Sequence, residues 1–273
     1  METDLVKFAN RIRVETLKTL LHLGFGHFGG SMSIVEILAA LYGKVMRVNP
    51  QQPDWGDRDY FVLSKGHGGP ALYCTLALKG FFPIEKLQTL NKNRTLLPSH
   101  PDRLKTVGID ATTGSLGQGL SIATGIAFSH YLRGLTNRTF CIVGDGELNE
   151  GQCWEALQFI AHHRLTNLTV IVDYNKMQLD GTLSDIIEPF SLVEKFSTFG
   201  FDCIEVDGKD VIKLAEVLDE KIADKPKLIV VNTIKGQGVS YLEEMNNCHH
   251  LRLDDVMKQA IQQAIIELEG KYA

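Results

Sequence analysis

The sequence between Thr139 and Gly181 places the strongest constraint on the fold of this 273-residue chain. Residues 139–143 are mostly β-branched or aromatic, and the run ends at Gly144-Asp145-Gly146, as is typical of a buried parallel strand. Apolar residues then recur at helical spacing over 151–164, and a second apolar run covers 168–172. A strand–helix–strand unit of this length makes a right-handed crossover, so we expect the two strands to be parallel.

Asp145 and Asn175 follow these two strands, and they are therefore predicted to share the edge of the sheet where open α/β proteins bind ligands. Mg²⁺ prefers about six oxygen ligands, usually one or two carboxylates together with phosphates and water. A carboxylate, an amide oxygen and a main-chain carbonyl near Met177 suit this ion. Gly144 and Gly146 allow close approach of a phosphate, and Gly146 can offer its N–H. The pattern favours a metal–diphosphate site over an ordinary glycine turn.

Gly144-Asp145-Gly146 followed by Asn175 resembles the signature of proteins that bind thiamine diphosphate (ThDP), and the stretch is similar to the transketolase version, here GDGELNEGQCWEA. The resemblance implies Mg²⁺, or another divalent cation such as Ca²⁺ or Mn²⁺, bound to Asp145, Asn175 and the main-chain carbonyl of Met177. It also assigns Gly144, Asp145, Gly146 and Asn175 to cofactor binding.

Four further motifs resemble transketolase, and each carries a histidine to which the family gives a role in cofactor binding or catalysis. His27, in a glycine-rich loop with Phe28 in place of the family's proline, is expected to face the cofactor and substrate channel. His67, in SKGHG, is expected to contact the diphosphate. His100 is expected to meet the hydroxyl end of the donor substrate, and His249 to lie near the diphosphate and the reacting carbon.

The stretch GIDATTGSLGQG resembles the family block whose backbone holds the aminopyrimidine ring, which assigns that role to Gly114 and Leu116. Ser115 stands where the family usually has proline. Cys248 and His250 flank the aligned histidine where the family usually has tryptophan and glycine.

The remaining pattern predicts one α/β domain over 1–273, with a doubly wound parallel sheet of about five strands and helices on both faces. It corresponds to the diphosphate-binding (PP-type) domain of the ThDP-binding fold. Ser33 and Glu36 are expected to form a capping box. The other strands are expected at 60–64, 202–206 and 228–234, and the other main helices at 5–23, 34–46, 71–78, 120–132, 211–222 and 254–268.

Composition excludes several classes of function. A net charge of −5 argues against binding to nucleic acid or to an anionic membrane surface. No apolar run is long enough to span a bilayer, and no signal-peptide pattern begins the chain. Five scattered cysteines without a C-x-x-C pair indicate reduced thiols, so we expect a cytoplasmic protein.

The resemblance covers nearly the whole chain but only the first of the three transketolase domains. The family's pyrimidine domain, which carries the glutamate that activates the cofactor, and its C-terminal domain are expected on a partner chain. We therefore expect the N-terminal subunit of a split transketolase, active in an α₂β₂ complex. Such an enzyme transfers a two-carbon ketol unit from a ketose or ketose phosphate to an aldose.

Three alternatives compete with this interpretation. The α-type subunit of a 2-oxo acid dehydrogenase E1 component also carries the metal motif alone, but the histidine-bearing motifs favour sugars. A nicotinamide-binding oxidoreductase would use Gly66-x-Gly68-x-x-Ala71 as its fingerprint, but the polar stretch 88–98 stands where a second strand ending in an acid is expected. A non-catalytic interaction subunit is disfavoured by the intact Asp145 and Asn175.

Overall fold

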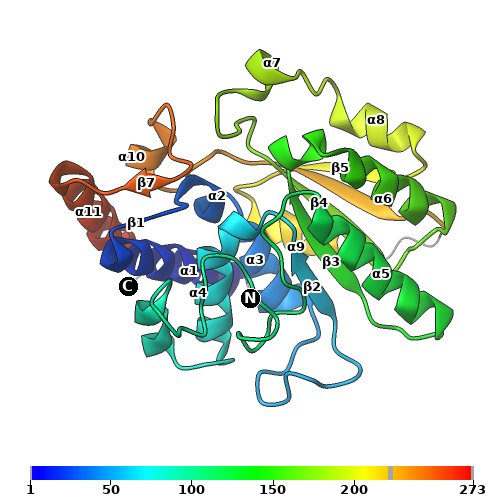
Figure 1. Cartoon of the computed structure of the whole chain (residues 1–273), viewed down its shortest axis with the longest axis horizontal. Coiled ribbons are helices and arrows are strands. Elements are labelled where there is room, and N and C mark those ends of the chain that lie inside the picture. Colours follow the sequence, from blue (N-terminus) through cyan, green and yellow to red (C-terminus); the bar gives the residue numbers. More distant parts are fainter. Residues whose placement is uncertain (1, 221–223, 272–273) are drawn as a thin grey trace.

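The computed structural model describes residues 2–220 and 224–271, and its centre is a five-stranded parallel sheet (Figure 1). The strands follow the order β2-β3-β4-β6-β5, and each neighbouring pair is parallel. Their bounds are β2 (Tyr60–Leu63), β3 (Thr139–Gly144), β4 (Leu168–Tyr174), β5 (Asp202–Asp207) and β6 (Lys227–Asn232). The α/β class and the sheet predicted from the sequence are confirmed.

Helices cover both faces of this sheet because alternate residues of each strand point to opposite sides. Phe140 and Ile142 of β3 belong to one apolar core, whereas Cys141 and Val143 belong to a second core on the other face. The first core is covered by α1 (Glu2–Leu23), α3 (Val35–Ala40), α4 (Gly69–Lys79), α9 (Val211–Asp219) and α11 (Asp255–Lys271). The second is covered by α5 (Gln118–Leu132), α6 (Gly151–His162) and α8 (Leu192–Thr198).

The crossover from β3 to β4 fixes the edge where the predicted site lies. Gly144 is in register with Asp173, and the Asp145 amide donates to the Asp173 carbonyl at 3.2 Å. After β3 the chain forms a short 3₁₀ turn, η4 (Gly146–Asn149), before α6 begins. Asp145 therefore lies beside the end of β4, as the parallel arrangement predicts.

Short elements bring distant loops together around this edge. β1 (Phe25–Gly26) pairs antiparallel with β7 (Leu251–Arg252), which joins the loops that carry His27 and His249. The Gly29 amide also donates to the Cys248 carbonyl at 2.8 Å. The other short elements are α2 (Gly29–Met32), η1 (Leu41–Val45, a π-helical turn), η2 (Gly66–Gly68), η3 (Ile84–Thr89), α7 (Leu183–Ile186) and α10 (Ser240–Glu243).

The main helices and strands lie within a few residues of their predicted bounds. The predicted helix 34–46 is α3 followed by the π-helical turn, and residues 221–222 of the predicted helix 211–222 lie outside the described residues. The capping box is wrong: Ile34, without a side-chain cap, precedes α3. The Ser33 hydroxyl donates to Asp173, and Glu36 pairs with Arg13, because both face the buried interior.

No helix among the described residues is long and apolar enough to cross a bilayer. All five cysteines are unpaired, and four of them are buried.

The Asp59 carboxylate ties the start of the sheet to its surroundings. It is fully buried and accepts hydrogen bonds from the backbone and guanidinium groups of both Arg47 and Arg138. Burial alone would raise the pKa of this carboxyl, but the donors of the two arginines hold its pKa below the usual value. The carboxylate therefore stabilises the folded state in its ionised form.

We predict that Asp59→Ala lowers the free energy of unfolding at pH 7 by about 2–3 kcal/mol, because several charge-assisted hydrogen bonds are lost. Since the folded pKa is depressed, the contribution is fully present above the unfolded pKa of about 3.9 and is lost as the pH falls through the folded value. Urea unfolding should show the deficit shrinking from pH 7 towards pH 3. The exposed Asp57→Ala serves as control, and equal losses in both variants would contradict the role of Asp59.

Candidate functional site

The predicted site residues converge at the carboxyl edge of the parallel sheet. A pocket of about 180 Å³ opens there. It is lined by these predicted residues: His67, Leu116, Gly144, Asp145, Gly146, Asn175, Met177 and His249. The other three, His27, His100 and Gly114, lie next to this set, as the ring contacts and glycine geometry below show.

Asp145 is a buried carboxylate that forms no direct ion pair among the described residues. Its two oxygens accept from the backbone amides of Gly146 at 2.8 Å and Lys176 at 2.6 Å. Burial, and then the negative charge of Asp173, raise the pKa of Asp145 to about 7. A divalent cation at this carboxylate would offset both effects, so the residue fits the role of metal ligand that the sequence predicts.

Asn175 and Met177 supply neutral oxygens beside Asp145. The Asn175 amide nitrogen donates to Asp173 at 3.1 Å, and its oxygen accepts from the Met177 amide at 3.1 Å. The Met177 carbonyl lies 3.5 Å from the Lys235 ammonium. Within the described ranges, no three His, Cys, Asp or Glu side chains are grouped to hold a metal. A cation here would therefore use the mixed oxygen set that suits Mg²⁺.

The N–H of Gly146, predicted to face phosphate, is already engaged by the Asp145 carboxylate. Positive charge at the pocket comes instead from Lys65 and Lys235, which both line it. The Lys235 ammonium donates to the Gln178 carbonyl at 2.9 Å, and burial lowers the pKa of this lysine. A diphosphate in the pocket would meet both ammonium groups.

Asp173, fully buried at the end of β4, joins four segments around the site. It accepts from Ser33 at 2.7 Å, Lys65 at 2.5 Å, Asn175 at 3.1 Å and Thr233 at 2.5 Å. Burial favours the neutral acid, but the charge and hydrogen bond of Lys65 hold the pKa of Asp173 below its usual value. The ion pair positions Lys65 and the amide of Asn175 together.

Glu147 performs a similar task on the other side of the pocket. Its carboxylate accepts from the Ser64 hydroxyl at 2.5 Å and from the amides of Gly117 at 2.8 Å and Gly144 at 3.0 Å. Burial raises the pKa of this carboxyl. Glu147 therefore connects the turn after β3 to the loop that contains Leu116.

Gly114 lies against His100, and its conformation requires glycine. Its φ is +137°, and a Cβ atom there would lie 2.9 Å from the His100 ring. A Cβ atom on Gly66 would in turn lie 2.8 Å from the Gly114 backbone. The loop that is predicted to hold the aminopyrimidine is thus packed directly on two of the other motifs.

Five histidine rings form one cluster at the mouth of the pocket. The His27 ring centroid lies 5.6 Å from that of His67, 6.0 Å from His100, 5.4 Å from His249 and 4.7 Å from His250. His67 and His249 are 4.9 Å apart. The structure therefore brings together the four predicted histidines and adds His250, which stands out in the sequence only as a departure from the family pattern.

Burial keeps the imidazoles of His27, His67 and His249 neutral at neutral pH. It lowers the pKa of His27 to about 4 and that of His249 to about 3, and neighbouring histidines and lysines add to the effect. The pKa of His67 is also well below its usual value for the same reasons. A neutral imidazole can both donate and accept a hydrogen bond, so the cluster suits sugar hydroxyl groups.

Sequence reasoning missed the charged residues that support the site: Lys65, Asp173, Glu147 and Lys235. A usable signal existed for three of them. Lys65 and Lys235 each begin a glycine-rich turn directly after an apolar strand. Asp173 ends an apolar run that is typical of a buried strand, and a carboxylate at such a position has little access to water and needs partners within the protein. The resemblance assigned roles to glycines, histidines, Asp145 and Asn175, and it gave none to the charged residues next to them in the chain, Lys65, Glu147 and Asp173.

Comparison with known proteins identifies the family to which this constellation belongs. Residues 5–266 match the model of the transketolase thiamine diphosphate binding domain. The chain belongs to this family.

The relatives include both short and long proteins. The 6-deoxy-6-sulfo-D-fructose transketolase subunit SqwG of Clostridium sp. (strain MSTE9) is 47% identical over 274 residues, which cover 100% of this chain and 98% of that protein. An apulose-4-phosphate transketolase subunit of Actinobacillus succinogenes is 38% identical over 226 residues, 82% of each chain. Human transketolase is 35% identical over 267 residues, 96% of this chain but 42% of the human protein.

Solved structures agree with this assignment. Transketolase from Campylobacter jejuni superposes with a TM-score of 0.87 at 28% identity, over 97% of this chain and 43% of that one. Transketolase from Leishmania mexicana gives a TM-score of 0.83 at 30% identity, over 98% and 45%. The chain thus spans less than half the length of these solved transketolases, and it has the ThDP-binding fold.

The nicotinamide alternative loses its structural basis. Its fingerprint needs a second strand ending in an acid about twenty residues after the glycines. The described residues between α4 and α5 contain the 3₁₀ helix η3 and loops, and no strand.

We predict that Lys65 and Asp173 act as a coupled pair. Lys65→Met leaves a buried carboxylate without its counter-ion and should lower the free energy of unfolding by about 3–5 kcal/mol. Asp173→Asn should lower the free energy of unfolding by a similar amount. The loss in the double variant should be smaller than the sum of the two single losses by more than about 1 kcal/mol. Urea unfolding of all four proteins measures the coupling. Additive losses would show that the pair does not act as a unit, and exposed Lys86→Met is the control.

A second prediction concerns acid sensitivity of the cofactor-free protein. Because the pKa of His249 is lowered on folding, its contribution to the free energy of unfolding is fully present above the pKa of the unfolded state, about 6.5, and is lost as the pH falls below that value. Between pH 7 and pH 5, the free energy of unfolding of the wild type should fall by about 1 kcal/mol more than that of His249→Gln, with allowance for partial exposure of the ring. Urea unfolding at both pH values tests this, with exposed His162→Gln as control. An equal change in both variants would refute it.

Proposed function

We propose that this chain is the N-terminal subunit of a split, Mg²⁺- and ThDP-dependent transketolase that works in the cytoplasm. The single observation that carries the proposal is the convergence of Asp145, Asn175 and four predicted histidines at one sheet edge. Two of the reported relatives, which are similar in length to this chain, are named as transketolase subunits. Unpaired cysteines support a reducing compartment.

In this proposal the chain binds the diphosphate half of the cofactor. Asp145, Asn175 and the Met177 carbonyl would hold the cation, while Lys65 and Lys235 would face the phosphate oxygens. When bound, ThDP supplies the carbanion chemistry that breaks and remakes a carbon–carbon bond beside a ketone. The activating glutamate and the pyrimidine-binding surface would come from a C-terminal partner subunit, in an α₂β₂ complex.

The histidines of this chain would handle the protons of the sugars. His100 and His27, which flank the mouth of the pocket, would hydrogen-bond the hydroxyl groups of the donor ketose. A neutral imidazole can accept the proton of the ketose hydroxyl as the carbon–carbon bond breaks, and can return one to the aldehyde oxygen of the acceptor aldose as the new bond forms. His67 and His249 would lie deeper, beside the diphosphate.

The donor is proposed to be a ketose with an anionic terminal group. The names of two relatives specify a sulfonated sugar and a sugar phosphate, which supports this class. Contacts to the terminal group of the acceptor are proposed for the partner subunit.

The test uses the complex rather than the isolated chain. Native mass spectrometry of the complex from its host would identify the partner for co-expression. The purified complex with ThDP and Mg²⁺ should transfer a ketol unit from fructose 6-phosphate, xylulose 5-phosphate or 6-deoxy-6-sulfofructose to an aldose, and should not turn over pyruvate. Turnover of pyruvate without ketol transfer would favour the 2-oxo acid dehydrogenase alternative instead.

Asp145→Ala should reduce ketol transfer by at least about a hundredfold, since it removes the carboxylate ligand of the proposed cation. Asp57 is exposed and precedes β2, at the end of the strands opposite the site, so Asp57→Ala should leave the rate unchanged. Unchanged activity and cofactor affinity in Asp145→Ala would refute the metal assignment and favour a non-catalytic interaction subunit.

A further inference from the structure

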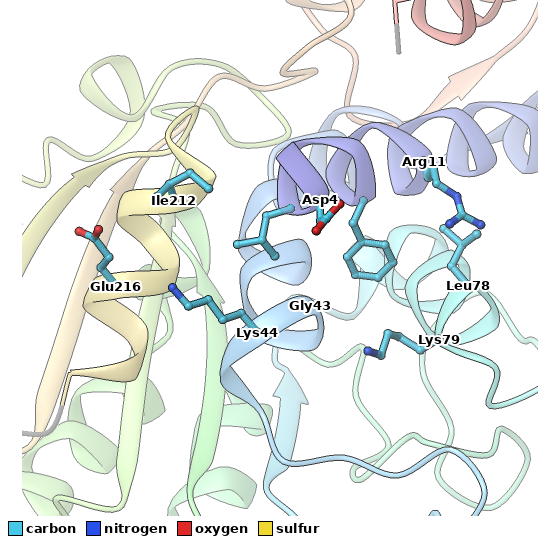
Figure 2. Close-up of a pocket in the computed structure, with 10 residues that line it drawn as sticks. Asp4, Arg11, Gly43, Lys44, Leu78, Lys79, Ile212 and Glu216 are labelled. Atoms are coloured by element: carbon cyan, nitrogen blue, oxygen red, sulfur yellow. The ribbon is translucent and has the colours of Figure 1, made fainter. Parts of the chain in front are cut away.

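A second and larger pocket lies at the ends of α1 and α4 that are remote from the candidate site (Figure 2). Its volume is about 510 Å³, and it shares no lining residue with the site at the sheet edge. Its walls come from the first turns of α1, the π-helical turn η1, the last residues of α4 and the start of α9. Pockets of about 300–1,000 Å³ are the usual size for small-molecule ligands.

Three cations from three different elements surround this pocket: Arg11 of α1, Lys44 of η1 and Lys79 of α4. None of the three forms an ion pair with a carboxylate in the part of the chain that the structure describes. Partial burial lowers the pKa of Lys79. Figure 2 shows the ammonium group of Lys44 extended towards α9, on the side where Glu216 is drawn, and that of Lys79 lying below α1.

Two carboxylates, Asp4 and Glu216, also line the pocket. Glu216 pairs with Lys213 on the surface of α9 at 3.2 Å, and Asp4 has an interaction of its own. With three cations and two carboxylates, the lining carries an excess of one positive charge, which an anionic ligand would neutralise.

The floor of the pocket is apolar. It is formed by Leu5, Phe8, Leu78 and Ile212, and the ammonium of Lys79 lies 6.0 Å from the centre of the Phe8 ring. An apolar floor with a cationic rim suits a ligand that has an apolar body and one anionic group. A polar sugar phosphate would leave the floor unmatched.

Gly43 lets η1 pack closely against the Leu5 and Phe8 side chains of α1. A Cβ atom on Gly43 would lie 2.6 Å from Leu5 Cδ2 and 3.2 Å from Phe8 Cδ1, so a side chain here would crowd the floor. Glycine within a helix is less favourable than alanine. π-helical turns are uncommon in proteins, and many of those that occur lie at functional sites. Both unfavourable features coincide at this pocket.

We propose that the pocket binds a small organic anion, an aromatic or aliphatic phosphate or carboxylate, with its apolar body on Leu5, Phe8 and Leu78. Its anionic group would meet Lys79, with Lys44 and Arg11 on the walls to either side. The site is independent of the proposed transketolase reaction.

The probe is 2-naphthyl phosphate, titrated into the full chain and into the complex by calorimetry, with saturating ThDP and Mg²⁺ to occupy the other anion site. The phosphate should bind at least tenfold more tightly than 2-naphthol, which has the same apolar body. Lys44→Gln/Lys79→Gln should weaken phosphate binding at least tenfold and leave the protein folded, because Lys44 is exposed and Lys79 is only half-buried. Lys86→Gln, an exposed lysine outside the pocket, should bind like wild type.

Three results would overturn the proposal. They are no binding of the phosphate up to about 1 mM, equal affinity for 2-naphthol, or wild-type affinity in the folded double variant. The last result would place the anion elsewhere on the protein.

Discussion

The rest of the site depends on one buried ion pair, between Lys65 after β2 and Asp173 at the end of β4. Both side chains are almost completely inaccessible to solvent, so their attraction must be accompanied by further hydrogen bonds that satisfy the charges. Ser33, Thr233 and Asn175 supply them. One carboxylate thereby joins the turn before α3, the ends of two strands and the amide that is proposed to bind the cation. Its position is a consequence of the parallel register of β3 and β4.

This arrangement places an acidic group and two basic groups side by side at the carboxyl ends of the strands. Asp145 is a carboxylate that burial and Asp173 keep from ionising fully, while Lys65 and Lys235 present positive charge to the same pocket. A divalent cation that also binds a diphosphate satisfies both kinds of group at once. The chain is proposed to bind the diphosphate half of the cofactor, and its match to the thiamine diphosphate binding domain of transketolases supports this proposal.

The sheet and its helices were predictable because parallel strands and amphipathic helices leave strong periodic patterns. The convergence of Asp145 with Asn175, and of His27 with His67, His100 and His249, followed from sheet topology and motif resemblance. Other features depended on contacts between distant segments. Ser33 and Glu36 have the spacing of a capping box, but in the folded chain the Ser33 hydroxyl bonds to Asp173 and the Glu36 carboxylate pairs with Arg13 instead. The ring contact of His250 with His27 depends on the pairing of β1 with β7, two strands of two residues each that leave no periodic signal.

The position of the bound cation tests the central claim most directly. Crystals of the complex grown with ThDP and Mn²⁺ would show the ion by anomalous diffraction. The account predicts one strong peak per site, bounded by the Asp145 carboxylate, the Asn175 amide oxygen, the Met177 carbonyl and the cofactor's diphosphate. A peak among the histidine rings, or ordered ThDP without an ion at Asp145, would contradict it.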